Sequence, residues 1–281
     1  MKYTEAVFKI DPPDPGREII MAELAEVGFE SFEYTDDGLK GWAPEEAFSL
    51  SAVNEIAERY ASLCKVTFTY GDITPVNWNE EWEKNYAPVV IDGRCGIRAP
   101  FHPPFTALDF DIVIEPKMSF GTAHHSTTAL MTGWLLDMDL KGKTVLDMGC
   151  GTGVLAILAA LKGAGKIVAI DNYIWAYENT VENCARNGAG HIKAIHGDVT
   201  ALRGMENQFD LILANINRNV LLDDMGAYAA CLRPDGMLLM SGFFAEDEEA
   251  LRQQADAHGL EFLDSRHQEQ WSSVLTRRRI Q

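Results

Sequence analysis

The sequence predicts an α/β protein in which a doubly wound sheet is preceded by a small α+β domain of the ferredoxin-like βαββαβ order. Three observations lead to this prediction. Strand-like and helix-like segments alternate from about residue 117 to the end of the chain. A glycine-rich turn follows the strand that contains Thr144, and the residues before the alternating part give the order strand, helix, two strands, helix, strand. We expect a small domain at residues 1–75, a helical linker at 76–91 and the doubly wound domain at 92–281.

The elements of the small domain follow from the spacing of their apolar residues. Residues 4–10 alternate between apolar and polar side chains, as a half-buried strand does. Residues 15–29 have helical spacing, with Ile20 and Leu24 on one stripe. The remaining elements are strands at 29–35 and 39–43 around the turn at 36–38, a helix at 51–63 and a strand at 65–73.

The linker carries aromatic residues at helical spacing. Trp78, Trp82 and Tyr86 recur every four residues, so they form one stripe on a helix that we expect to stop before Pro88. We expect this stripe to pack between the two domains. Residues 92–116 contain several prolines between short apolar pieces, which predicts short strands and loops.

The doubly wound domain repeats strands and helices in regular alternation. The predicted strands are 143–149, 166–172, 191–199, 209–216 and 236–244, with two more closing the chain. The predicted helices are 154–163, 173–188, one that ends near residue 232, and 246–259. Ligands of such sheets bind at the carboxyl ends of the strands, where the strand order reverses, so we expect the functional site there.

Composition and charge limit the classes of function. The chain has 281 residues and a formal net charge of −18, so its surface repels phosphate backbones and anionic lipids. We expect no direct nucleic-acid partner and no membrane partner, whereas a basic protein would be attracted from a distance. No apolar run reaches the roughly 18 residues of a membrane span and no signal-peptide pattern is present, which favours a cytoplasmic location. The five cysteines are scattered without a CxxC pair, so we expect buried, reduced thiols and no metal site.

A glycine-rich loop follows the first strand of the doubly wound domain. Residues 147–153 read DMGCGTG, and their glycines allow a sharp turn and a close approach of a ligand to the backbone. A helix begins directly afterwards, and its free N–H groups point to the same place. A dinucleotide fold requires glycine at the sixth position counted from Gly149, where Val154 stands. The D-x-G-x-G-x-G spacing instead resembles the first motif of class I methyltransferases.

Three polar residues follow the next strands along the chain. Asp171 ends the second strand, where a carboxylate can accept hydrogen bonds from both hydroxyls of a ribose. Asp198 follows the third strand and Asn215 ends the fourth. The resemblance to class I methyltransferases implies that Asp198 contacts the adenine amine of S-adenosylmethionine (SAM). It also implies that Asp147, the first residue of the glycine motif, faces the amino-acid end of that cofactor.

A further signature lies upstream of the glycine loop. Residues 118–130 read MSFGTAHHSTTAL, which resembles the FGTGxHxTT signature of the ribosomal protein L11 methyltransferases, the PrmA family. The aromatic linker with Trp78, Trp82 and Pro88 also resembles the linker of that family. The resemblance implies a class I methyltransferase sheet preceded by a substrate-recognition domain.

The resemblance also assigns roles to individual residues. It implies contacts with SAM from Phe120, Gly121, Thr128, Asp147, Gly149, Gly151, Asp171, Asp198 and Asn215. Phe120 and Gly121 would belong to a loop that closes over the cofactor. Asn215 is similar to the polar residue that holds the target nitrogen in amine and amide methyltransferases, so it is the predicted catalytic residue. Ala123 departs from the family pattern, which usually has glycine there, and alanine would strain the loop if that position needs a positive φ.

Two adjacent histidines, His124 and His125, stand within the same signature. Adjacent histidines rarely point at one ion, and no matching carboxylate motif accompanies them, so we expect no metal. A proton relay through one of them is left open.

Four hypotheses follow for the function. The resemblance implies SAM-dependent methylation of ribosomal protein L11 on lysine side chains and on the N-terminal amine. A second hypothesis keeps this chemistry and changes the acceptor to another protein or a small amine. The third is a nicotinamide oxidoreductase, against which the glycine spacing argues. The fourth is a SAM-binding protein without catalytic activity, against which the presence of Asp171 and Asn215 argues.

Overall fold

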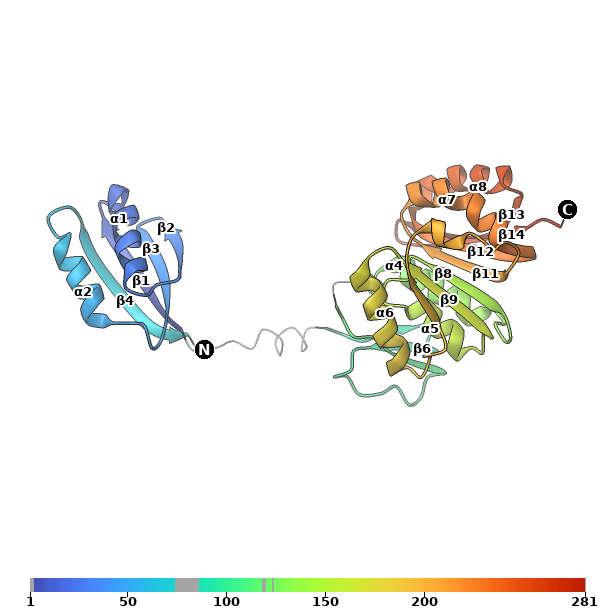
Figure 1. The fold of residues 1–281 in the computed structure, drawn as a ribbon, viewed down its shortest axis with the longest axis horizontal. Helices are drawn as coiled ribbons and strands as arrows, with labels where there is room; N and C mark the ends of the chain where they lie inside the picture. The colour runs from blue at the N-terminus through green and yellow to red at the C-terminus, as the bar shows by residue number, and fades with distance from the viewer. Residues whose placement is uncertain (1–2, 74–85, 118–119, 123, 281) are drawn as a thin grey trace. The chain divides into compact units, whose positions relative to one another are not determined.

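The chain divides into two compact units, Met1–Asn85 and Tyr86–Gln281, in a computed structural model (Figure 1). The structure describes residues 3–73, 86–117, 120–122 and 124–280. Three positions singled out in the sequence lie outside the described residues: Trp78 and Trp82 of the linker stripe, and Ala123 of the signature.

The smaller unit is an antiparallel sheet with two helices, as the sequence predicts. Its strands follow the spatial order β2-β3-β1-β4, and neighbouring strands run antiparallel. The elements are β1 (Tyr3–Asp11), α1 (Pro13–Glu26), β2 (Ser31–Thr35), β3 (Gly38–Pro44), α2 (Leu50–Arg59) and β4 (Lys65–Ile73). This order of elements and strands is the ferredoxin-like βαββαβ arrangement.

One face of this sheet carries the core of the smaller unit. Ala6, Phe8 and Ile10 alternate along β1 and are buried, as the period of a strand requires. Ile20 of α1 and Ile56 of α2 belong to the same apolar cluster. Both helices therefore cover the same face of the sheet.

The larger unit begins with a three-stranded sheet in the order β5-β6-β7. Its strands are β5 (Val89–Ile91), β6 (Cys95–Arg98) and β7 (Phe110–Val113). The predicted helical linker is wrong at its C-terminal end, because residues 86–88 are not helical and 89–91 form β5. Pro88 disfavours a helical turn before it, and the β-branched residues after it favour a strand, which pairs with β6.

A seven-stranded sheet forms the centre of the larger unit. Its strand order is β10-β9-β8-β11-β12-β14-β13, and β14 runs antiparallel to both of its neighbours while the other pairs are parallel. The strands are β8 (Thr144–Met148), β9 (Lys166–Asp171), β10 (Lys193–His196), β11 (Phe209–Asn215), β12 (Leu232–Phe244), β13 (Leu260–Gln268) and β14 (Trp271–Arg278). The helices are α4 (Ser126–Asp137), α5 (Val154–Leu161), α6 (Ile174–Arg186), η1 (Val199–Leu202), α7 (Arg218–Cys231), η2 (Ala245–Asp247) and α8 (Glu248–Ala257). The order reverses between β8 and β11, which places the topological switch point there.

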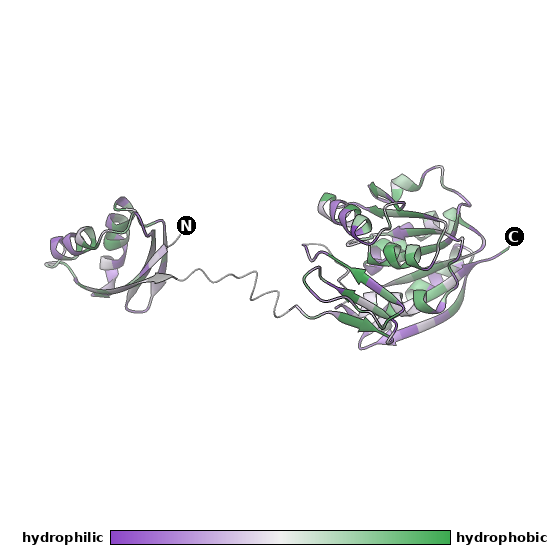
Figure 2. Cartoon of the chain, turned by 90° about the horizontal axis from the view of Figure 1, so that it is seen from below, coloured by the Kyte–Doolittle hydropathy of each residue, from purple (hydrophilic) through white to green (hydrophobic). Residues whose placement is uncertain are grey.

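Alternating residues along the central strands face two separate cores. Val145 of β8 packs into one apolar cluster with α4 and α5, whereas Leu146 packs into another with α7 and α8. All positions of β8 are buried, and Figure 2 shows the central strands coloured mainly as hydrophobic. Helices therefore cover both faces of the sheet, as the predicted doubly wound fold requires.

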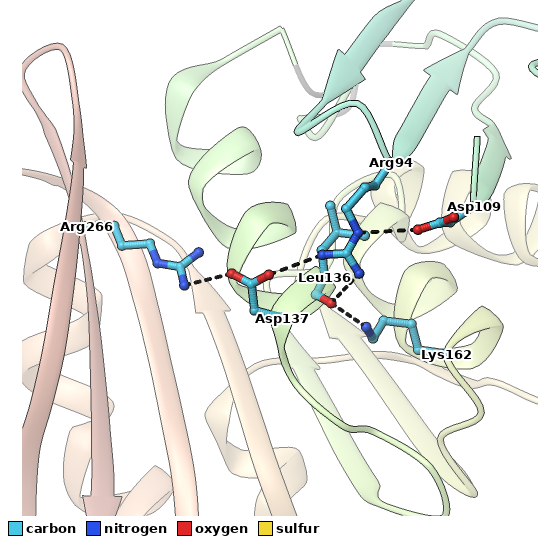
Figure 3. A network of polar contacts seen from close by, with 6 residues as sticks. All are labelled: Arg94, Asp109, Leu136, Asp137, Lys162 and Arg266. Atoms are coloured by element: carbon cyan, nitrogen blue, oxygen red, sulfur yellow. Dashed lines mark hydrogen bonds and ion pairs between the residues drawn. The ribbon is translucent and has the colours of Figure 1, made fainter. Parts of the chain in front are cut away.

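The sequence pattern did not predict α4, which is buried on nearly every side. Cations gather at its C-terminal end (Figure 3): Arg94 and Lys162 donate to the carbonyl of Leu136 at 3.0 and 2.7 Å. Arg94 and Arg266 also form ion pairs with Asp137 at 3.1 and 2.9 Å. Positive side chains complement the negative end of the helix dipole, so this network anchors α4 to its neighbours.

The cysteines and the apolar content of the helices can be compared with the sequence prediction. All five cysteines are buried and free. Burial raises the pKa of the Cys95 thiol to about 12, so this thiol stays protonated. Within the described ranges, no helix has the length and apolar content that crossing a membrane requires.

Candidate functional site

A cavity of about 520 Å³ lies at the carboxyl ends of β8, β9 and β11. Its size is within the roughly 300–1,000 Å³ of small-molecule and cofactor pockets. Most of the predicted cofactor residues line it: Phe120, Gly149, Gly151, Asp171, Asp198 and Asn215. The other three, Gly121, Thr128 and Asp147, do not line it: Thr128 is hydrogen-bonded to the lining residue Asn215, whereas Gly121 and Asp147 accept from Thr152 and Ala156. The cavity therefore lies at the switch point where the sequence predicts a ligand.

The glycine loop between β8 and α5 has a backbone conformation that other residues resist. Gly149, Gly151 and Gly153 have φ angles of +70°, +58° and +80°. A Cβ on Gly149 would lie 2.2 Å from Cγ2 of Ile216, and a Cβ on Gly151 would lie 2.2 Å from the carbonyl oxygen of Phe120. Glycine spacing thus brings bare backbone to the cavity, where a ligand can approach it closely.

Asp147 is buried beneath this loop. Its Oδ2 accepts a hydrogen bond from the amide of Ala156 at 3.1 Å, in the first turn of α5. Its Oδ1 is buried and has no hydrogen-bond partner in the part of the chain that the structure describes. Burial, opposed by the Ala156 bond and reinforced by the charge of Asp171, raises the pKa of Asp147 to about 7. Such an oxygen would accept readily from a cationic group of a ligand.

Asp171 ends β9 at the cavity wall and is 7% exposed. Its Oδ2 accepts from the amide of Gly151 and its Oδ1 from the amide of Tyr173, each at 2.9 Å. These bonds fix the orientation of the carboxylate. Each oxygen keeps a second lone pair, so the pair of oxygens can still accept from two hydroxyls.

Asp198 lines the cavity just after β10, where it caps η1. Its Oδ1 accepts from the hydroxyl of Thr200 at 2.6 Å and from the amide of the same residue at 2.9 Å. These bonds to Thr200 hold the pKa of Asp198 below its usual range. Both bonds use Oδ1, so Oδ2 can accept from an amine.

Asn215 ends β11 in the wall of the same cavity. Its Nδ2 donates to the hydroxyl of Thr128 at 3.4 Å, which orients the amide. Its Oδ1 is buried and has no partner among the described residues. A buried carbonyl-type acceptor without a partner is costly, so this oxygen is poised for a donor on a ligand.

Phe120 and Gly121 are both hydrogen-bonded to one residue of the glycine loop, Thr152. The amide of Thr152 donates to the carbonyl of Phe120 at 2.9 Å, and its hydroxyl donates to the carbonyl of Gly121 at 2.7 Å. Phe120 is 53% exposed and forms part of the cavity wall. This segment therefore contributes a wall to the cavity from outside the sheet.

Several residues of the cavity wall were missed in the sequence. Tyr173 and Trp175, at the start of α6, line the cavity, and each is 68% exposed. Their position just after the strand that ends in Asp171 is a signal that could have identified them. Val220 and Asp224 of α7 also line the cavity, and only the fold brings that helix to this edge.

A row of aromatic rings runs from the cavity wall to Phe244 at the carboxyl end of β12, and we call it the aromatic row. The ring of Phe120 lies 5.2 Å from that of His125, which lies 4.6 Å from that of Trp271. Trp271 in turn lies 4.4 Å from Phe244. No sequence pattern connects these residues, because Phe244 and Trp271 meet only through the pairing of β12 with β14.

Both adjacent histidines form hydrogen bonds with other residues of the larger unit. His124 contacts the Thr122 hydroxyl through Nδ1 and the carbonyl of Ala87 through Nε2. His125 contacts the Thr127 hydroxyl through Nδ1. These contacts give no support to the proton relay that the sequence left open. Across the described ranges, no group of three His, Cys, Asp or Glu side chains could hold a metal.

The residues around the cavity fit SAM. The glycine loop offers a backbone cradle, and Asp171 offers two oriented acceptor oxygens for ribose hydroxyls. The buried Oδ1 of Asp147, which has no partner among the described residues, is a further acceptor next to the glycine loop, although Asp147 itself does not line the cavity. Asp198 supplies a further acceptor oxygen, suited to an amine, in the cavity wall.

Comparison with known proteins identifies the family. The model of the family described as ribosomal protein L11 methyltransferase (PrmA) matches residues 19–279. The chain belongs to this family. PrmA membership makes the chain a SAM-dependent methyltransferase, in agreement with the glycine motif and with the fold.

Relatives of the PrmA family extend over nearly the whole chain. A ribosomal protein L11 methyltransferase of Porphyromonas gingivalis is 44% identical over 283 residues, covering 98% of this chain and 97% of its own length. One of Bacteroides fragilis is 42% identical over 277 residues, with 98% and 99% covered. The crystal structure of a ribosomal protein L11 methylase from Lactobacillus delbrueckii subsp. bulgaricus superposes with a TM-score of 0.63 at 26% identity. It covers 69% of this chain and 100% of its own.

Proposed function

We propose that the protein transfers methyl groups from SAM to amines of ribosomal protein L11, on lysine side chains and on the N-terminal amine. One observation carries the proposal. Asn215, whose Oδ1 has no partner in the part of the chain that the structure describes, lies in the wall of the same cavity as the glycine loop. An acceptor of an amine N–H and a cradle for SAM thus share one cavity. The relatives named for L11 methylation match both units of the chain, which supports L11 as the acceptor.

Each predicted cofactor residue has a place in this proposal. SAM, when bound, supplies a methyl group on a positively charged sulfur, from which an amine can displace it. Gly149 and Gly151 would hold the amino-acid end against bare backbone, with Asp147 accepting from its ammonium. Asp171 would orient the ribose and Asp198 the adenine amine.

Asn215 would hold the attacking amine. A lysine amine has a pKa of about 10.4, so its deprotonation at pH 7 costs roughly 4–5 kcal/mol, whereas an α-amine near 8 costs roughly 1 kcal/mol. The Oδ1 of Asn215 can accept one N–H of the neutral amine and direct its lone pair, while Thr128 fixes the amide. A neutral acceptor does not favour the ammonium form as strongly as a carboxylate would, which suits repeated methylation.

The aromatic row would provide the apolar side of the acceptor site. Phe120 lines the cavity, and the aromatic row leads from its ring through His125 to Trp271 and Phe244 at the carboxyl end of β12. Aromatic faces suit the aliphatic stem of a lysine and exclude water from the amine. Exclusion of water disfavours the charged ammonium, which lowers the cost of deprotonation.

The N-terminal unit would recognise the ribosomal protein. It has its own sheet, helices and core, and its predicted range, 1–75, contains 15 Asp and Glu against 6 Lys and Arg. A folded acidic unit without a cofactor motif is suited to grip a basic protein. A cytoplasmic location, the lack of direct nucleic-acid contact and the lack of a metal stay predictions from the sequence.

The test of the proposed function is isotope transfer from methyl-labelled SAM into separated ribosomal proteins. We expect label in L11 and in no other ribosomal protein at comparable rate. Label in a different protein, or in small amines alone, would show that this molecule is the methyl acceptor and would contradict the assignment of L11 as the substrate. Binding of NADH in place of SAM by calorimetry would contradict the cofactor assignment itself.

A further inference from the structure

His124 joins two parts of the larger unit that are distant in sequence. Its Nε2 lies 2.8 Å from the carbonyl oxygen of Ala87, next to the residue where this unit begins. Its Nδ1 lies 3.1 Å from the hydroxyl of Thr122. The Tyr86 ring lies 4.8 Å from the His124 ring, and its hydroxyl is hydrogen-bonded to Thr122. We call Tyr86, Ala87, Thr122 and His124 the entry clamp.

The bonds of the entry clamp have a definite direction. A carbonyl oxygen only accepts, so Nε2 of His124 carries the proton that it donates to Ala87. In the neutral ring Nδ1 is then an acceptor, and Thr122 donates to it. Thr122 has a single hydroxyl proton, which goes to Nδ1, so the phenol of Tyr86 is the donor in its bond with Thr122. The Thr122 hydroxyl thus lies at the centre of a chain of bonds that runs from Tyr86 to Ala87.

The same segment forms the wall of the cofactor cavity. Thr122 directly follows Gly121 and Phe120, whose carbonyls bind the hydroxyl and the amide of Thr152 in the glycine loop. Phe120 lines the cavity and begins the aromatic row. The entry clamp is therefore joined, through Thr122, to the segment that contributes Phe120 to the cavity wall.

We propose that His124 is a positioning residue that couples the chain entry at Tyr86–Ala87 to the wall formed by Phe120 and Gly121. The inference rests on the proposed function, because a displacement of Tyr86–Ala87 would be caused by L11 bound to the N-terminal unit. Docking of L11 would then change the affinity of the cofactor cavity, and cofactor would change the affinity for L11 by the same factor.

A matched pair of variants tests the clamp without a large change in shape. Thr122→Val keeps the shape of the side chain and removes the hydroxyl at the centre of the bond chain. Thr122→Ser keeps the hydroxyl and removes a methyl group. His124→Ala removes both His124 bonds, and His124→Gln restores an N–H that can reach the carbonyl of Ala87.

The measurement is the Kd of S-adenosylhomocysteine with and without saturating L11, by calorimetry on the full-length protein. This probe is SAM without its methyl group, so it binds without reacting. We expect L11 to change its Kd at least about fivefold in the wild type and in Thr122→Ser. In Thr122→Val and His124→Ala the change should fall below about twofold, and His124→Gln should recover part of it.

The outcomes separate this inference from the proposed function. Labelled methyl transfer to L11 is measured on the same wild-type preparation. Transfer with no effect of L11 on the Kd, or an effect that Thr122→Val retains, overturns the clamp and leaves the proposed function intact. Absence of transfer to L11 overturns the proposed function, and the clamp inference falls with it. Transfer together with coupling that is lost in Thr122→Val and kept in Thr122→Ser supports both.

Discussion

The side-chain amide of Asn215 has a donor and an acceptor, and among the described residues only the donor has a partner. The hydroxyl of Thr128 accepts a hydrogen bond from Nδ2 at 3.4 Å, whereas the buried Oδ1 has no partner among the described residues. A protein gains nothing in stability from such an oxygen. The arrangement is explained if the oxygen receives an N–H of the acceptor amine during the reaction.

Removal of this oxygen should affect turnover more than cofactor binding. Asn215→Ala is expected to lower kcat at least about tenfold and to change the Kd of SAM less than about threefold, because the amine is held most strongly in the transition state. Asp171→Ala is the matched comparison and should weaken SAM by about 1–3 kcal/mol. Steady-state kinetics and calorimetry on both variants measure the split. A kcat of Asn215→Ala within about twofold of wild type, with SAM binding lost, would make Asn215 a cofactor residue only.

Asp147 gives a prediction for pH. Its pKa is raised by burial to about 7, above the roughly 3.9 of an unfolded aspartate, so the folded protein favours the neutral form. The stabilisation is complete below the unfolded pKa and is lost as the pH rises through about 7. Relative to Asp147→Asn, the unfolding free energy of the ligand-free wild type should fall by up to about 1.4 kcal/mol per unit between about pH 5 and 7. Denaturant titrations across this range measure the difference, and a constant difference would contradict the buried neutral carboxyl.

At the scale of elements, the loop from β8 to α5 shows what the glycine spacing does. Gly151→Ala places a Cβ against the carbonyl oxygen of Phe120 in a backbone with positive φ. We expect a loss of about 1–3 kcal/mol in unfolding free energy and at least about tenfold weaker SAM binding. Gly190→Ala is the control, because a Cβ there meets no atom within 4 Å, and it should change neither quantity measurably. Equal behaviour of the two variants in thermal unfolding and calorimetry would show that the loop conformation is not required.

The elements that the sequence predicted are those with a clear apolar period or a motif at a strand end. The ends of parallel strands meet at one edge, so Gly149, Asp171 and Asn215 were expected together, and all three line one cavity. α4 was missed because ten of its twelve residues are buried, which leaves no polar stripe to reveal a helix. The place of Trp271 in the aromatic row was missed because antiparallel pairing brings it beside Phe244, and the sequence does not state which strands pair.

At the scale of the whole molecule, the two units differ in what they contain. The larger unit contains the cavity and its own two cores, whereas the smaller unit has a separate core and no cofactor motif. This division predicts that recognition of L11 and binding of SAM can be separated by truncation.

Deletion of residues 1–75 should leave the Kd of SAM within about threefold. Methylation of L11 should fall at least about a hundredfold, equivalent to about 2.7 kcal/mol of docking energy. SAM titration and methyl transfer are measured on one truncated preparation that circular dichroism shows to be folded. Full methylation by that fragment would contradict the recognition role, and loss of SAM binding by a folded fragment would contradict the independence of the cavity.

The most direct measurement is peptide mapping of L11 by mass spectrometry after reaction with SAM, using the wild type and Asn215→Ala side by side. We expect methyl groups on lysine side chains and on the N-terminal amine of L11 with the wild type, and strongly reduced methylation of the same amines with the variant at saturating SAM. Unmodified L11 from a wild-type preparation that binds SAM, or methyl groups only on atoms other than amine nitrogens, would contradict the assignment of this cavity to amine methylation.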